Sequence, residues 1–149
     1  MNVLAPIVLF VYNRPWHTEQ TVTSLFKNDL ADASDLIIFS DAPKKEAAAG
    51  KVEEVRRYLK GIHGFKSVSI IEREKNWGLA NSIIDGVTAV VNKYGKVIVL
   101  EDDIVTSPFF LQFMNDGLNI YAENKRVMQI AGYMFPIDSA DLPETFFLG

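Results

Sequence analysis

The chain has 149 residues, of which 48% are hydrophobic and 23% are charged. That composition supports the buried core of one domain and differs from that of a disordered segment. The absence of cysteine excludes disulfides, thiolate catalysis and cysteine-ligated metals. A formal net charge of -4 argues against a nucleic-acid partner, because contacts to a phosphate backbone need a basic face.

Apolar runs alternate with stretches of helical spacing along the chain. We expect strands at 3–12, 35–40, 67–72, 96–100 and 127–133, and helices at 18–26, 44–60, 79–94 and 109–121. Pro15 suits the first turn of the first helix, and Gly50 weakens the start of the second, so its regular part is expected from Lys51. The alternation predicts an α/β fold of right-handed βαβ units, with a mostly parallel sheet and helices on both faces.

The first apolar run argues against a membrane-spanning segment. The run from Val3 to Val11 is interrupted by Pro6, and it is too short to cross a bilayer. We therefore expect a cytoplasmic protein and leave peripheral attachment of a full-length protein to a membrane open.

Three acids follow the apolar run at 97–100, namely Glu101, Asp102 and Asp103. An unbroken apolar run is typical of a strand buried on both faces in the middle of a parallel sheet, and ligands bind beyond the carboxyl ends of such strands. Adjacent carboxylates need a cation, a basic partner or strong hydrogen bonds. Strand geometry directs Asp102 away from its two neighbours, so the three need not share one role. A solvated strand end is the plainer alternative.

Polar residues also follow the first two predicted strands. Asn13 and Arg14 come after the first strand, where an arginine can bind a phosphate or a base carbonyl, or simply face solvent. Asp41 follows the second strand and suits either a contact to a base or ribose or a tight turn.

The loop before the third predicted helix contains Asn76, Trp77, Gly78 and Leu79. Glycine permits close backbone approach to a ligand at a helix start, whereas Trp77 suits either stacking on a ligand or packing. Together these loops and the acids describe a nucleotide site at one sheet edge. Mg²⁺ or Mn²⁺ suits this all-oxygen setting, because such ions take one or two carboxylates together with water and ligand phosphates.

Four stretches carry a resemblance to a known superfamily: FVYNRP, FSDAP, NWGLANSI and VLEDDIVTSPFFLQF. They are similar to the donor-binding half of GT-A glycosyltransferases. The acidic triplet resembles that of the N-acetylglucosaminyltransferases that initiate complex N-glycans, and the N-x-G-L-A stretch resembles bacterial family-two enzymes.

The resemblance implies a role for each candidate residue. Asp103 matches the metal-binding acid of the DxD-type motif. Asp41 matches the acid that contacts the base, and Glu101 and Asp102 match the acids that contact the ribose or the donor sugar. The full set of positions that match nucleotide and donor contacts is Asn13, Arg14, Asp41, Asn76, Gly78, Leu79, Glu101 and Asp102. It also implies a nucleotide-diphosphate sugar donor, with a UDP-sugar favoured, and a carbohydrate or lipid-linked acceptor.

The resemblance covers an N-terminal part of such an enzyme. The catalytic base of the family usually follows the fifth strand, and no residue of this chain matches it. We therefore expect residues 1–149 to form a single nucleotide-sugar-binding domain that is inactive by itself. The apolar triplet at 146–148 leads us to expect self-association.

Two other functions remain open. A sugar-nucleotide pyrophosphorylase has a similar sheet, but it needs a glycine-rich loop after the first strand, and the segment at 10–15 contains no glycine. A dehydrogenase fails for the same reason, because it needs G-x-G-x-x-G. A noncatalytic module that binds a carbohydrate or a partner is the alternative from a different class.

Overall fold

A four-stranded parallel sheet forms the centre of the computed structural model, which describes residues 3–133. The strands are β1 (Ile7–Val11), β2 (Asp35–Ser40), β3 (Ser67–Glu72) and β4 (Ile98–Glu101), and their order across the sheet is β3-β2-β1-β4. Every neighbouring pair is parallel, as the βαβ alternation predicts. Residues 146–148, expected to promote self-association, lie outside the described part of the chain.

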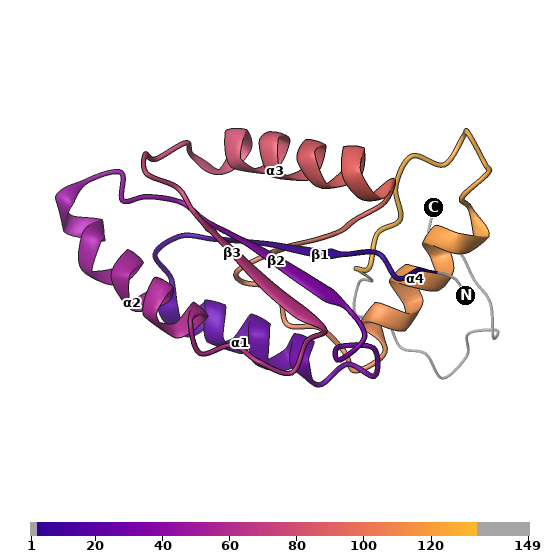
Figure 1. Ribbon diagram of the computed structural model, residues 1–149, viewed down its shortest axis with the longest axis horizontal. Helices are drawn as coiled ribbons and strands as arrows, with labels where there is room; N and C mark the ends of the chain where they lie inside the picture. Colours follow the sequence, from indigo (N-terminus) through magenta and orange to yellow (C-terminus); the bar gives the residue numbers. More distant parts are fainter. Residues whose placement is uncertain (1–2, 134–149) are drawn as a thin grey trace, which may run out of the picture.

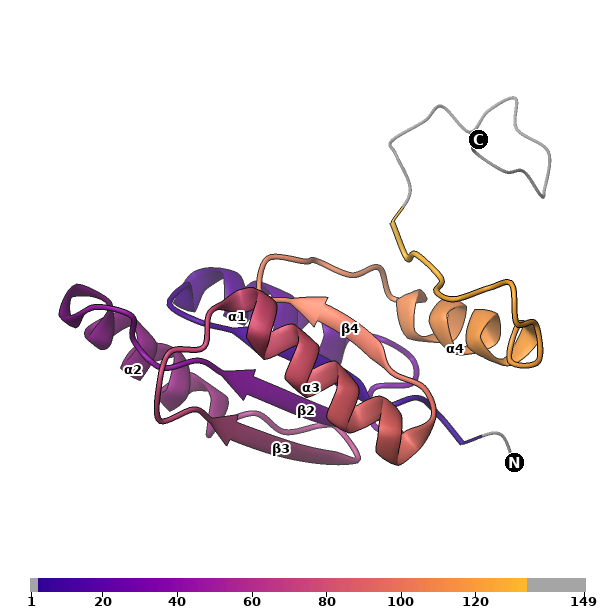
Figure 2. The same cartoon turned by 90° about the horizontal axis from the view of Figure 1, so that it is seen from above.

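Helices cover both faces of the sheet (Figure 1). The helices are α1 (Pro15–Phe26), α2 (Ala49–Leu59), α3 (Leu79–Tyr94) and α4 (Phe110–Ile120). One face packs against α1 and α2, and the opposite face packs against α3, which lies in front of the strands in Figure 2. The α/β architecture is confirmed. The regular part of α2 begins at Ala49, slightly before the expected Lys51, and a 3-10 turn (Glu46–Ala48) precedes it.

The strand before the acids lies at an edge of the sheet within residues 3–133, so its predicted central position is wrong. The central role belongs to β1, whose five residues are all buried between β2 and β4. In β4, Ile98 and Leu100 are buried, but Val99 is 39% exposed. A continuous apolar run cannot distinguish a central strand from an edge strand that is covered on one face, because both contain β-branched residues.

The expected strand at 127–133 is also absent from the described structure. Part of the segment contacts α4 instead of joining the sheet, whereas Met128 is 96% exposed. Ile130 lies against Gly117, and Gly132 lies against Phe110 and Met114. Contact with a helix thus partly buries Ile130 without any strand pairing.

The interface between α3 and the sheet depends on small residues. Phe10 and Phe39 stack with ring centroids 5.3 Å apart, and the buried residues of α3 are Ser82, Gly86 and Val90. A Cβ atom at Gly86 would lie 2.9 Å from Phe39 and 3.0 Å from Phe10. Glycine at this position therefore lets the helix approach the two rings.

Within residues 3–133, none of the helices combines the length and the apolar character needed to cross a membrane.

The substitution Gly86→Ala should destabilise the fold. Alanine normally stabilises a helix relative to glycine by roughly 0.5–1 kcal/mol, but overpacking against two core rings costs about 1–3 kcal/mol. We expect a net fall in the free energy of unfolding, measured by urea denaturation. Gly50→Ala in α2 is the matched control, because a Cβ atom there meets nothing within 4 Å, and it should stabilise. A gain from both substitutions would contradict the close packing of α3.

Candidate functional site

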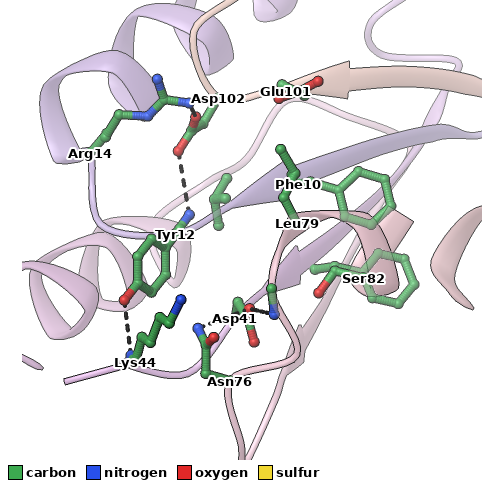
Figure 3. Close-up of a pocket in the computed structure, with 13 residues that line it drawn as sticks. Phe10, Tyr12, Arg14, Asp41, Lys44, Asn76, Leu79, Ser82, Glu101 and Asp102 are labelled. Carbon is green, nitrogen blue, oxygen red and sulfur yellow. Dashed lines mark hydrogen bonds and ion pairs between the residues drawn. The ribbon is translucent and has the colours of Figure 1, made fainter. Parts of the chain in front are cut away.

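A pocket of about 290 Å³ opens at the carboxyl ends of β1, β2 and β4 (Figure 3). Its volume is at the lower end of the range for small-molecule sites. Most of the residues predicted from the sequence line it: Arg14, Asp41, Asn76, Gly78, Leu79, Glu101 and Asp102. Asn13 and Asp103 do not line it, although Asp103 contacts Arg14 at its rim. Segments far apart in the sequence therefore meet at one edge of the sheet.

Arg14 binds two of the three acids. One guanidinium nitrogen donates to Asp102, and the other donates to Asp103 over 2.9 Å. The Asp102 side chain is 3% exposed and also accepts a 3.3 Å hydrogen bond from the backbone N–H of Tyr12, whereas the Asp103 side chain is 44% exposed. Burial opposes the charged form of Arg14, but hydrogen bonds and charge from the two aspartates outweigh it and raise the pKa of Arg14. The basic partner that the acidic cluster requires is thus Arg14.

This arrangement limits how a metal ion can bind. The described residues contain no group of three or more acids and histidines placed to hold a metal. Asp102 is buried and engaged, so Asp103 is the more accessible carboxylate. One carboxylate suits an Mg²⁺ or Mn²⁺ ion that arrives with ligand phosphates and keeps several waters. The single accessible carboxylate therefore fits an ion that is bound mainly by the phosphates of a ligand, and Arg14 has to release Asp103 for that ion to bind.

Asp41 anchors the loop before α3. Its side-chain oxygens accept hydrogen bonds from the backbone N–H groups of Ala42, Trp77 and Gly78, each at 2.9 Å, and from the Asn76 amide at 3.1 Å. Asp41 is 7% exposed, and an ionised carboxylate accepts about four hydrogen bonds in all. A contact from Asp41 to a base would therefore require it to exchange one of these bonds.

The loop held by Asp41 sets the start of α3. Gly78 adopts φ 73°, a left-handed conformation that favours glycine. The ring of Trp77 lies 3.9 Å from the guanidinium of Arg73, which also pairs with Asp85. Trp77 does not line the pocket, so this contact supports its packing alternative.

Several pocket residues were not predicted from the sequence: Phe10, Val11, Tyr12, Phe39, Lys44 and Ser82. Lys44 donates its backbone N–H to the Tyr12 hydroxyl over 2.9 Å. Its position shortly after Asp41 in the sequence is the signal that could have predicted it as a pocket residue. Phe10 and Phe39 resemble ordinary core residues in sequence, and nothing local distinguishes Ser82.

Comparisons with known proteins identify the fold. No family model matches the sequence, and no curated protein matches it. A mannosyltransferase, PcManGT from Pyrobaculum calidifontis, solved with GDP-Man and Mn²⁺, superposes with a TM-score of 0.57 at 14% identity over 80% of this chain and 32% of that one. S. aureus TarS superposes with a TM-score of 0.56 at 12% identity over 80% of this chain and 20% of that one. The chain thus spans about a third and a fifth of these structures, and its α/β fold is one found in glycosyltransferases.

The substitution Asp41→Asn should loosen the 76–78 loop. Asparagine keeps one carbonyl oxygen that accepts hydrogen bonds, but its NH₂ group replaces the second carboxylate oxygen and cannot accept from the donors bound there. An unpaired buried donor costs about 1–3 kcal/mol. We expect a fall in unfolding free energy of that size and faster hydrogen exchange at the Trp77 and Gly78 amides. Asp32→Asn, at an exposed position, is the control. Unchanged exchange at both amides would show that Asp41 does not anchor the loop.

Arg14 should compete with free metal ions for Asp103. We expect Arg14→Gln to bind Mn²⁺ several-fold more tightly than the wild type without nucleotide, because the competing cation is removed. Titration of free Mn²⁺ by electron paramagnetic resonance measures this. Arg57→Gln, on the exposed side of α2, should bind as the wild type does. Equal affinity in both variants would rule out the competition.

Proposed function

We propose that this chain binds a nucleotide-diphosphate sugar together with a divalent metal ion and forms the donor-binding part of a glycosyltransferase. The observation that carries the proposal is the pocket at the strand ends, where Arg14 binds Asp102 in the pocket and Asp103 at its rim, in a fold found in glycosyltransferases. The structure of the mannosyltransferase in complex with GDP-Man and Mn²⁺ supports the choice of ligand and ion.

The pocket has a chemically distinct part for each half of a nucleotide. Phe10, Phe39 and Leu79 provide apolar walls, which suit a flat base. Arg14 and Lys44 provide positive charge, which suits a diphosphate. A nucleoside diphosphate satisfies both parts at once, whereas a free sugar uses neither the apolar walls nor the cations fully.

Asp103 and Arg14 exchange partners when the donor binds. The Asp103 carboxylate is accessible and is the residue that would hold the metal, while Arg14 turns from Asp103 toward a phosphate oxygen. Glu101 and Asp102 are the acids next to the ribose and the donor sugar. An ion held at Asp103 would supply positive charge that offsets the negative charge of the diphosphate leaving group.

The finer assignments follow from the resemblance of the sequence motifs. The donor is a UDP-sugar in preference to others, the transferred group is a hexose or N-acetylhexosamine, and the acceptor is a carbohydrate or lipid-linked hydroxyl. A comparison of donors tests these choices.

Calorimetry with UDP and GDP, each with and without Mn²⁺, tests the proposal. We expect at least one of them to bind the 149-residue chain more tightly by tenfold or more with Mn²⁺, and we expect Asp103→Asn to remove that enhancement. Asp116→Asn, which changes an exposed acid on α4, is the matched control and should retain it. Wild-type protein that binds neither nucleotide, or binds them without any metal effect, would refute the proposed function.

A further inference from the structure

Ser82 has a buried hydroxyl without a partner. It lies one turn into α3 and is 5% exposed, and among residues 3–133 its Oγ atom has no hydrogen-bond partner. A serine inside a helix usually bonds to the carbonyl four residues earlier. Here the carbonyl of Gly78 accepts the backbone N–H of Ser82 at 3.0 Å, and the hydroxyl makes no such bond. Buried polar groups are rarely left unpaired in this way, because the lost hydration is costly.

The pocket explains the unpaired hydroxyl. Two other buried polar side-chain atoms in the described part of the chain lack a partner, on Thr21 and Arg73, but of the three residues only Ser82 lines the pocket. Figure 3 shows Ser82 toward the side of the pocket that contains Phe10, away from Arg14 and Lys44. The hydroxyl is therefore the unpaired buried group on the apolar side of the site. Less than 1 Å² of its oxygen is exposed, so a ligand contacts it once a neighbouring pocket side chain has moved aside.

Asp41, which the sequence resemblance implies as the contact to the base, is already engaged. Its oxygens hold the backbone of the 76–78 loop. Ser82, by contrast, loses no existing bond when a ligand arrives. A serine hydroxyl has one donor and two lone pairs, so it can donate to a carbonyl or ring nitrogen of a base, or accept from a ring N–H.

We propose that Ser82 is the hydrogen-bond contact to the edge of the nucleobase and sets the base preference of the site. This inference rests on the proposed function and deepens it. The base lies against the apolar walls near Phe10 and Leu79 and pairs its edge with Ser82, while its diphosphate extends toward Arg14. Asp41 positions the loop that begins α3 and thereby places Ser82.

The test measures the affinity of UDP, GDP, CDP and ADP for the wild type and for Ser82→Ala, at constant Mn²⁺, by calorimetry. For the base that the wild type prefers, we expect affinity to fall about 5- to 10-fold, the effect of one lost hydrogen bond. We expect little change in the affinity of the nucleotides with the other three bases, so that the difference in affinity between the preferred base and the others becomes smaller. The melting temperature should stay the same or rise, because the substitution removes an unpaired buried group.

Thr88→Ala is the matched control, since it removes a hydroxyl from the exposed side of the same helix; its affinities should equal those of the wild type. Unchanged affinities in Ser82→Ala would overturn the inference. An equal loss of affinity for all four nucleotides would also overturn it, because it indicates a contact to the ribose or the phosphates. If the melting temperature falls as well, the loss indicates a structural role. If the wild type binds none of the four, the proposed function itself fails, whereas wild-type binding with no effect of Ser82→Ala rejects only the role of Ser82.

Discussion

The ion pairs from Arg14 to Asp102 and Asp103 are the interaction on which the site depends. They join the loop after β1 to the loop after β4, which are neighbours in the sheet although they are about ninety positions apart in the chain. Adjacent carboxylates at a strand end repel one another, and one of them is buried, so a positive charge has to lie beside them. Arg14 supplies that charge to both aspartates without a ligand, and in the proposed complex the metal ion would supply it to Asp103.

A second network holds the opposite wall of the pocket. Asp41, at the end of β2, accepts hydrogen bonds from the loop at 76–78 and so fixes the start of α3. The same helix approaches Phe10 and Phe39 through Gly86. These two contacts fix the position of the first turns of α3 beside the pocket. Ser82 lies there with its hydroxyl unpaired. Structural anchoring and ligand contact are thus divided between Asp41 and Ser82.

The pairing of β4 with β1 has a functional consequence. Because β4 pairs with β1, the acids after Glu101 lie beside the loop that contains Arg14. A strand order with β4 elsewhere would separate Arg14 from the acids and leave Asp102 without its partner. The topology of the sheet, more than any single motif, creates the pocket.

The sequence by itself determined the alternation of strands and helices, the parallel sheet and most of the residues at its carboxyl edge, because apolar periodicity and strand-end polar residues are local signals. It did not determine that β4 is an edge strand within residues 3–133, or that 127–133 forms no strand and contacts α4 through Ile130, because contact with a helix and burial in a sheet leave the same apolar pattern. Only the tertiary structure decided which polar groups are already satisfied. Arg14 engages the acids, Asp41 is saturated and Ser82 is unpaired, since hydrogen-bond partners distant in sequence become known only when the chain has folded.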